Sequence, residues 1–139
     1  DQARLLAMTG PIHERRIAAA LAGGERRVGA AFVRVRREGG IKRQRLEVRF
    51  DGLAGCLRTP AGGSSRQYVI VCQAGRIRIR RLNAREAARL MGAPETYRLP
   101  NSESAGLKLT GDAVAAPVVR ALAEALLRPA ALGVERIAR

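Results

Sequence analysis

The sequence predicts an α+β fold, in which small antiparallel β hairpins are flanked by helices. Stretches in the middle of the chain alternate apolar and charged side chains with the two-residue period of a strand, and glycine-containing turns separate them. Stretches on both sides of this region repeat their apolar residues at helical spacing. With 139 residues, of which 47% are hydrophobic, the chain is long enough to bury a core.

The first predicted helix covers residues 11–21. Pro11 occupies an early helical position, where proline is tolerated, and Ile17 and Leu21 lie four residues apart on one face. Two glycines then end the helix. We therefore interpret residues 1–25 as an N-terminal helix and linker.

Two β hairpins are predicted to follow. The segments FVRVRR (32–37) and RLEVRF (45–50) form the first, around a Gly-Gly turn. The segments QYVIVCQ (67–73) and RIRIR (76–80) form the second, around an Ala-Gly turn. Because alternate residues of a strand share a face, the three arginines of the last strand are expected to project together.

The segment after the second hairpin predicts a capped helix. Asn83 can accept a hydrogen bond at the helix start, and Glu86 can complete a capping box three residues later. Gly92 and Pro94 then stop the helix.

The remaining chain predicts a polar loop and one more helix. The loop is PNSESAG, residues 100–106. The helix runs from Val114 to Leu127, where apolar residues recur at helical spacing, with Pro117 in its first turn. Pro129 is predicted to end it.

Net charge is the strongest bulk signal. The chain has 26 Lys and Arg against 12 Asp and Glu, which gives a formal net charge of +14. No acidic residue occurs between residues 52 and 85, so the positive charge there is concentrated. A polyanion is the expected partner, and a solvated basic surface is the alternative. The arginines of this stretch are Arg58, Arg66, Arg76, Arg78, Arg80, Arg81 and Arg85.

Composition also argues against several other classes of protein. Two cysteines and one histidine cannot supply a usual four-ligand metal site, so no metal is predicted. No apolar run approaches the roughly 20 residues needed to cross a bilayer, and no signal peptide opens the chain. We therefore predict a cytoplasmic protein with reduced thiols and no membrane partner. The chain begins at Asp1 rather than Met, which we interpret as trimming or excision from a longer chain.

Three segments resemble parts of DNA (cytosine-5) methyltransferases. RRLNAREAARLMGAPETY (80–97) resembles the ninth family motif, and GDAVAAPVV (111–119) resembles the tenth. VRFDGLAGCLRTPAGGSSRQ (48–67), here named the recognition segment, is similar to the end of the family's target recognition domain. The residues that match the two motifs are Arg80, Leu82, Arg85, Glu86, Arg89, Gly92, Pro94 and Tyr97, then Gly111, Ala113, Val114, Pro117 and Val118.

The resemblance implies a division of the chain. It runs from about Met8 to Pro129 but covers only the C-terminal third of a complete enzyme. Residues 26–104 would form the target recognition domain, including the ninth-motif helix. Residues 105–139 would return to the catalytic domain and end in a helix. The fold would thus be a C-terminal part of the S-adenosylmethionine-dependent methyltransferase α/β fold.

The resemblance also implies a reaction, in which a methyl group passes from S-adenosylmethionine to C5 of a flipped cytosine in duplex DNA. The family's Pro-Cys nucleophile is not in this sequence, because neither Cys56 nor Cys72 follows a proline. Cys72 reads as a small buried residue of a strand. No catalytic residue is therefore expected here, and the chain alone should not catalyse. Its partners would be double-stranded DNA and an N-terminal catalytic half, in the same or a separate chain.

Three sets of site residues follow from the resemblance. The ninth-motif side chains Arg85, Glu86 and Arg89 are expected to hold the recognition domain in shape. The backbone of the tenth motif would close over the methyl donor, although an aspartate stands where the family usually has Asn. The expected cofactor contacts are Asp112, Ala113 and Val114. The expected DNA contacts, to phosphates and base edges, are Arg58, Thr59, Ser64, Ser65, Arg66 and Gln67.

Alternatives remain open at this point. Many family members carry Thr followed by an aliphatic residue in the recognition segment, and either Cys56-Leu57 or Thr59-Pro60 could fill that place. The chain could also be a subunit of a split methyltransferase or a non-catalytic basic DNA-binding module. Exposure of Val114, Val118 and Leu122 would favour a missing partner over a self-contained module. An RNA-binding protein fits the charge but predicts neither motif.

Overall fold

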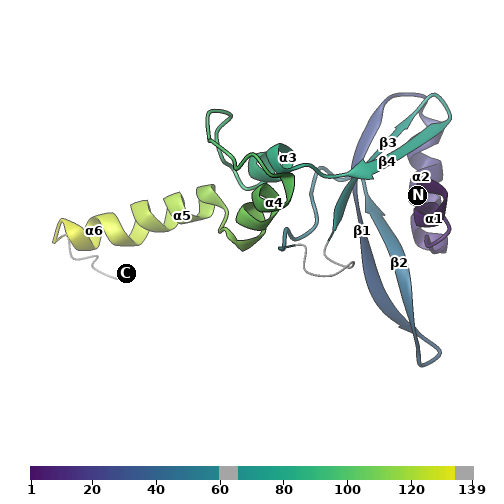
Figure 1. Ribbon diagram of the computed structural model, residues 1–139, viewed down its shortest axis with the longest axis horizontal. Helices are drawn as coiled ribbons and strands as arrows, with labels where there is room; N and C mark the ends of the chain where they lie inside the picture. The colour runs from purple at the N-terminus through teal and green to yellow at the C-terminus, as the bar shows by residue number, and fades with distance from the viewer. Residues whose placement is uncertain (60–65, 134–139) are drawn as a thin grey trace, which may run out of the picture.

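A four-stranded antiparallel sheet with flanking helices forms the centre of the computed structural model, which describes residues 1–59 and 66–133 (Figure 1). The strand order is β2-β1-β3-β4. Both predicted hairpins are present, and pairing of β1 with β3 joins them into one sheet. The predicted α+β class is confirmed. The strands are β1 (Arg27–Glu38), β2 (Ile41–Arg49), β3 (Gln67–Gln73) and β4 (Arg76–Arg81).

Two N-terminal helices, α1 (Gln2–Leu6) and α2 (Pro11–Ala22), cover one face of the sheet (Figure 1). The core between the helices and the sheet explains the alternation in the strands, because every second side chain points into it. The sequence did not predict α1, since one helical turn is too short to show a periodic pattern. The buried core residues are Leu5, Ile17, Ala20, Ala31, Val33, Leu46, Val48, Tyr68, Ile70 and Cys72.

The outer edge of β2 is capped by the N-terminal helices. The Leu46 amide donates to the Met8 carbonyl oxygen at 3.0 Å, and the Val48 amide donates to His13 Nδ1 at 3.1 Å. Arg16 Nη1 donates to the Val48 carbonyl oxygen at 3.0 Å. These contacts satisfy backbone groups that an edge strand would otherwise offer to another chain.

The other face of the sheet is partly open to solvent and rich in arginine. Arg76, Arg78 and Arg80 share this face of β4, as the alternation predicted, since the residues between them pair with the core side of β3. Part of the recognition segment crosses the same face. A Cβ atom at Gly55 would lie 3.0 Å from Phe32 Cδ1, and Gln67 Nε2 donates to the Cys56 carbonyl oxygen at 3.3 Å.

Helices α3 (Ala84–Leu90) and α4 (Glu103–Asp112) pack together beside the sheet (Figure 1). The capping box predicted for α3 is confirmed. The polar loop predicted over residues 100–106 is wrong, because Ser102 caps α4 and most of that segment is helical. The predicted boundary between residues 104 and 105 falls inside α4.

Tertiary packing explains why α4 forms despite two glycines. A Cβ atom at Gly106 would lie 2.6 Å from Ala84 Cβ, so glycine allows the two helices to approach closely. Glu103 Oε1 accepts a hydrogen bond at 2.7 Å from the Ala84 amide, a free donor at the start of α3. Neither contact is visible in the local sequence pattern.

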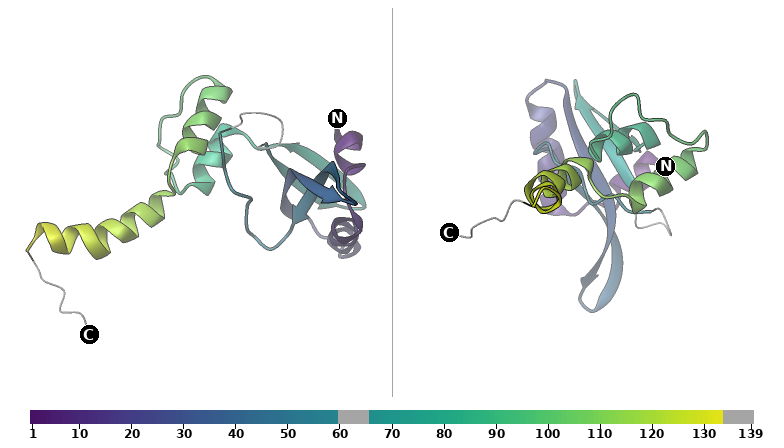
Figure 2. Two further views of the ribbon diagram at one scale, coloured as in Figure 1. Left: turned by 90° about the horizontal axis from the view of Figure 1, so that it is seen from below. Right: turned by 90° about the vertical axis from the view of Figure 1, so that its left-hand side faces the viewer.

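The C-terminal helix extends away from the rest of the chain (Figures 1 and 2). It comprises α5 (Ala116–Leu122), a π-helical turn (Ala123–Leu127) and α6 (Arg128–Ala131), with Pro117 in the first turn as predicted. The prediction that Pro129 ends the helix is wrong, since α6 continues to Ala131. A proline usually clashes with the carbonyl four residues earlier, and the wider π-helical turn just before Pro129 changes the position of that carbonyl.

Most large apolar side chains of this helix are exposed. Val118 and Leu122 are each 52% exposed, and Val114, which lies just before the helix, is 67% exposed. Such a stripe on an extended helix is typical of a surface that packs against another body. Within residues 1–59 and 66–133, no helix has both the length and the apolar character needed to span a membrane.

Candidate nucleic-acid interface

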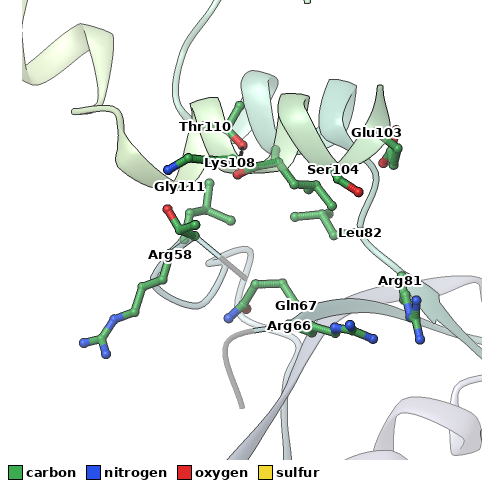
Figure 3. Close-up of a pocket in the computed structure, with 14 residues that line it drawn as sticks. Arg58, Arg66, Gln67, Arg81, Leu82, Glu103, Ser104, Lys108, Thr110 and Gly111 are labelled. Atoms are coloured by element: carbon green, nitrogen blue, oxygen red, sulfur yellow. Dashed lines mark hydrogen bonds between the residues drawn. The ribbon is translucent and has the colours of Figure 1, made fainter. Parts of the chain in front are cut away.

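A basic cavity of about 440 Å³ lies between the recognition segment, the end of β4 and α4 (Figure 3). Arg66 and Gln67 lie on its sheet side, while Glu103, Ser104 and Lys108 project from α4 on the opposite side (Figure 3). Four of the six predicted DNA contacts line this basic cavity, namely Arg58, Thr59, Arg66 and Gln67. The other two, Ser64 and Ser65, lie outside the described residues.

The lining of the basic cavity is strongly cationic. Arg58, Arg66, Arg81 and Lys108 contribute positive charge, against the single carboxylate of Glu103. No carboxylate within residues 1–59 and 66–133 pairs with any of the three arginines. Their guanidinium groups are therefore available for the oxygen atoms of an anion such as phosphate.

Gly111 lies where α4 packs against the recognition segment. A Cβ atom at this position would overlap the backbone of Arg58 and Thr59, at 2.7 Å from Thr59 Cα. Only glycine lets the end of α4 approach this backbone so closely. The first residue of the tenth-motif segment thus lies against two of the predicted DNA contacts.

The side chain of Asp112 strengthens the same junction. Its Oδ1 accepts a short hydrogen bond from the Thr59 hydroxyl, and its Oδ2 lies 2.9 Å from Lys108 Nζ. The Lys108 ammonium and then the Thr59 hydroxyl hold the pKa of Asp112 below its ordinary value of 3.8. The aspartate that replaces the family's Asn therefore has two partners suited to a carboxylate.

Loss of Lys108 should raise the pKa of Asp112. We predict that this carboxyl group titrates below 3.8 in the folded chain and that Lys108→Met moves it upward. Because the folded pKa is the lower one, the contact stabilises the fold above the unfolded pKa and is lost as pH falls through the folded value. Both side chains are exposed, so the effect on global stability is small. Titration of the Asp112 carboxyl carbon by NMR measures the shift. The same pKa in both proteins would contradict the contact.

The predicted cofactor contacts lie at the end of α4 and just after it, and they are Asp112, Ala113 and Val114. All three are exposed, and Ala113 has an extended backbone. A bound cofactor is usually enclosed over most of its surface. These residues can therefore supply one wall of such a site and no more. Hydrogen-bond donors there are backbone amides, because the Asp112 carboxylate can only accept and already has one protein partner on each oxygen.

The ninth-motif residues contribute two ion pairs, one at the junction of β4 and α3 and one between the end of α3 and the loop that follows it. Glu86 lies 2.6 Å from Arg80 Nη2, and it also accepts the Asn83 amide of the capping box at 3.0 Å. The Arg80 guanidinium holds the pKa of Glu86 below its usual range. Arg89 Nη2 donates to Glu95 at 3.0 Å. Arg85 differs, because its Nη1 is buried without a hydrogen-bond partner among the described residues.

The ninth-motif and tenth-motif segments also contact each other. Gly92 has a φ of +77°, and a Cβ atom there would lie 2.7 Å from Pro117 Cγ. The Ala116 amide donates to the Met91 carbonyl oxygen at 2.8 Å.

The sequence did not predict two residues that line the basic cavity, Glu103 and Lys108. Glu103 lies in the segment that was predicted to be a loop, and Lys108 lies in a segment to which no structure was assigned.

The two cysteines occupy different environments. Cys72 is fully buried in β3, which confirms the prediction that it is a core residue, and burial raises the pKa of its thiol. Cys56 is exposed in the recognition segment. No group of metal-ligating side chains occurs in the part of the chain that the structure describes.

The family profile of C-5 cytosine-specific DNA methylases matches residues 38–128, well over half of the chain. This chain belongs to that family. The matched region contains both segments that resemble the ninth and tenth motifs. The resemblance to the family is therefore confirmed.

Two curated methyltransferases are similar to part of this chain. Type II methyltransferase M1.ScrFI of Lactococcus lactis subsp. cremoris is 44% identical over 48 residues, which are 34% of this chain and 12% of that protein. Type II methyltransferase M.HgiCII of Herpetosiphon aurantiacus is 43% identical over 49 residues, which are 35% of this chain and 11% of that protein. No solved structure matches significantly. The matches therefore span about a ninth of the length of these relatives.

Proposed function

We propose that this chain is the DNA-recognising, C-terminal part of a cytoplasmic DNA (cytosine-5) methyltransferase. The whole enzyme transfers a methyl group from S-adenosylmethionine to C5 of a flipped cytosine in duplex DNA. The observation that carries the proposal is the basic cavity, where the recognition segment meets α4 and where Arg58, Arg66 and Arg81 have no acidic partner among the described residues. Family membership supports the reaction.

In this proposal, the arginines of the basic cavity bind DNA phosphates and base edges. Arg58 and Arg66 are exposed in the recognition segment, so both guanidinium groups can reach a duplex laid across it. Gln67 combines two roles, because its amide already donates to Cys56 and thereby positions the segment. Ser64 and Ser65 remain proposed contacts. Arg85, Glu86 and Arg89 act as structural support at the junction of α3 and the sheet.

The C-terminal helix would bind the catalytic half of the enzyme. Val118, Leu122 and Leu126 recur at intervals of four residues and are all exposed. Burying such a stripe against another domain stabilises the complex by roughly 25 cal/mol for each Å² of apolar surface removed from water. We therefore retain the proposed division into recognition residues 26–104 and returning residues 105–139, with α4 shared at the boundary.

Asp112, Ala113 and Val114 would form one wall of the S-adenosylmethionine site, completed by residues outside this chain. Bound S-adenosylmethionine supplies the methyl group, and the nucleophile also comes from outside this chain. Thr59 and Lys108 hold the Asp112 carboxylate, and these two contacts fix the position of the wall at the end of α4. A non-catalytic DNA-binding module is the rival function, and the exposed apolar stripe argues against it.

Methyl transfer distinguishes the two functions. Labelled S-adenosylmethionine and mixed-sequence duplex DNA would be incubated with this chain alone, and then with the catalytic half supplied as a second polypeptide. We expect incorporation only when both are present. Transfer by this chain alone would overturn the assignment of the nucleophile to another segment. DNA binding without transfer in either mixture would favour the non-catalytic module.

Arginine variants test the interface. Arg58→Gln/Arg66→Gln is expected to weaken duplex binding, whereas Arg15→Gln, on α2 at the opposite face of the sheet, should change it little. Equal binding by all three proteins would exclude the basic cavity as the DNA contact. Fluorescence anisotropy with a labelled duplex gives all three affinities.

A further inference from the structure

Beyond the four-stranded sheet, β1 and β2 continue as a two-stranded arm, residues 34–45 (Figure 1). β3 pairs with β1 only over residues 27–32, whereas β2 pairs with β1 as far as Glu38. Each side of the arm has five strand residues, so at about 3.3 Å per residue the arm extends roughly 17 Å beyond the sheet. Nothing in the core requires this extension, since Val33 and Leu46 are the last buried pair.

The arm places like charges directly opposite one another. Its strands carry six Lys or Arg residues and one carboxylate, Glu38. Three cross-strand pairs are cationic on both sides, and such pairs destabilise a hairpin. A pattern that opposes folding indicates that the charges serve another purpose. The pairs are Arg34 with Arg45, Arg36 with Arg43, and Arg37 with Lys42.

Two of these pairs lie on one face, here named the arginine face. Arg34, Arg36, Arg43 and Arg45 point away from the side of α1 and α2, because the buried pair Val33 and Leu46 points toward it. Glu38 accepts from Arg45 Nε at 2.7 Å, and Glu47 accepts from Arg36 Nε at 2.6 Å. The other two arginines lie no closer than 4.0 Å to these carboxylates. The arginine face therefore keeps an excess of positive charge.

The arginine face is continuous with the candidate nucleic-acid interface. A hollow of about 430 Å³ is lined by Arg34 and Arg36 of the arm together with Cys56, Arg58 and Gln67 of the recognition segment. The guanidinium of Arg34 lies 4.9 Å from the centre of the Phe32 ring, which supports it at the base of the arm. One basic surface thus runs from the basic cavity to the arm.

We propose that the arginine face of the arm is a second DNA contact, which binds the phosphate backbone beside the site read by the recognition segment. The proposal rests on the proposed function, because it takes duplex DNA as the partner. Phosphates between opposed arginines relieve the repulsion that the arm carries in isolation. Since one strand of DNA carries a phosphate about every 3.4 Å along the axis, an arm of roughly 17 Å covers about five base pairs.

Two double variants of equal charge test the proposal. Arg34→Gln/Arg43→Gln removes two charges from the arginine face and leaves both closest ion pairs in place. Arg37→Gln/Lys42→Gln removes two charges from the opposite face of the same arm. We expect the first variant to lower the slope of log affinity against log salt by about two and to bind about tenfold more weakly near 0.15 M salt. The second variant should keep a nearly unchanged slope.

Duplex length supplies the second measurement. Shortening the DNA on one side by about five base pairs should weaken binding by the wild-type chain and leave binding by Arg34→Gln/Arg43→Gln unchanged. Equal losses by both double variants, or no loss by either, would overturn the arm contact. Arg58→Gln/Arg66→Gln serves as the reference for the proposed function. If that variant loses affinity while both arm variants bind normally, only the arm contact is excluded, and if it too binds normally, the proposed function fails.

Discussion

Gly111→Ala is expected to weaken DNA binding and to destabilise the packing of α4 on the recognition segment. The added methyl group would overlap backbone atoms of Arg58 and Thr59, which cannot rotate aside as a flexible side chain could. Either α4 or the recognition segment must move, and overpacking of this kind typically costs about 1–3 kcal/mol. The movement would also pull Asp112 from Thr59 and open the basic cavity. Urea unfolding and duplex affinity measure the two effects.

Gly23→Ala is the matched control. Gly23 has a φ of −75°, and no heavy atom would lie within 4 Å of an added Cβ atom. Alanine at a compatible position is neutral or stabilises by about 0.4–1 kcal/mol, because it restricts the unfolded chain. Wild-type stability and affinity in Gly111→Ala would show that α4 does not pack on the recognition segment as described.

Leu46→Ala is expected to have the largest effect on stability. Leu46 is completely buried in the core, opposite Val33 in β1. Truncation removes the transfer free energy of the side chain and leaves a cavity, which together cost about 2–5 kcal/mol. Natural domains of this size unfold with only about 5–15 kcal/mol, so the variant should be close to its unfolding threshold at moderate temperature. The midpoint and slope of urea unfolding give the change.

Ile41→Ala, in the same strand, controls for the truncation of an aliphatic side chain to alanine. Ile41 is 59% exposed near the tip of the arm, so its truncation should change stability by no more than about 0.5 kcal/mol. Similar losses in both variants would show that the alternation in β2 does not divide buried from exposed positions. Wild-type stability of the Leu46→Ala protein would show that Leu46 does not lie in the core.

Features carried by neighbouring residues were predictable from the sequence. The alternation in QYVIVCQ predicts β3, and Asn83 with Glu86 predicts the capping box at the start of α3. The motif segments also predicted the family, since a motif is itself a local arrangement of residues. Periodicity and capping both act over a few residues, which is why one unaligned sequence is sufficient to show them.

The wrong predictions fall where a distant contact or a local adjustment of the backbone decides the structure. Residues 100–106 look like a loop because they are polar and include a glycine, yet Gly106 permits close packing on Ala84 and Glu103 caps α3. The continuation of the last helix past Pro129 depends on a π-helical turn that no sequence pattern showed. In both cases a contact or a backbone adjustment reversed the intrinsic preference of the residues.

The sequence by itself determined the α+β class, the strand alternation, the basic charge and the family to which this chain belongs. Only the tertiary structure decided that β1 joins the two hairpins into one sheet, that Gly111 and Asp112 meet Thr59, and that β1 and β2 extend into an arginine-faced arm. Thr59 and Asp112 are 53 residues apart in the chain. Contacts at such separation depend on how complete elements pack, and short-range periodicity carries no information about that packing.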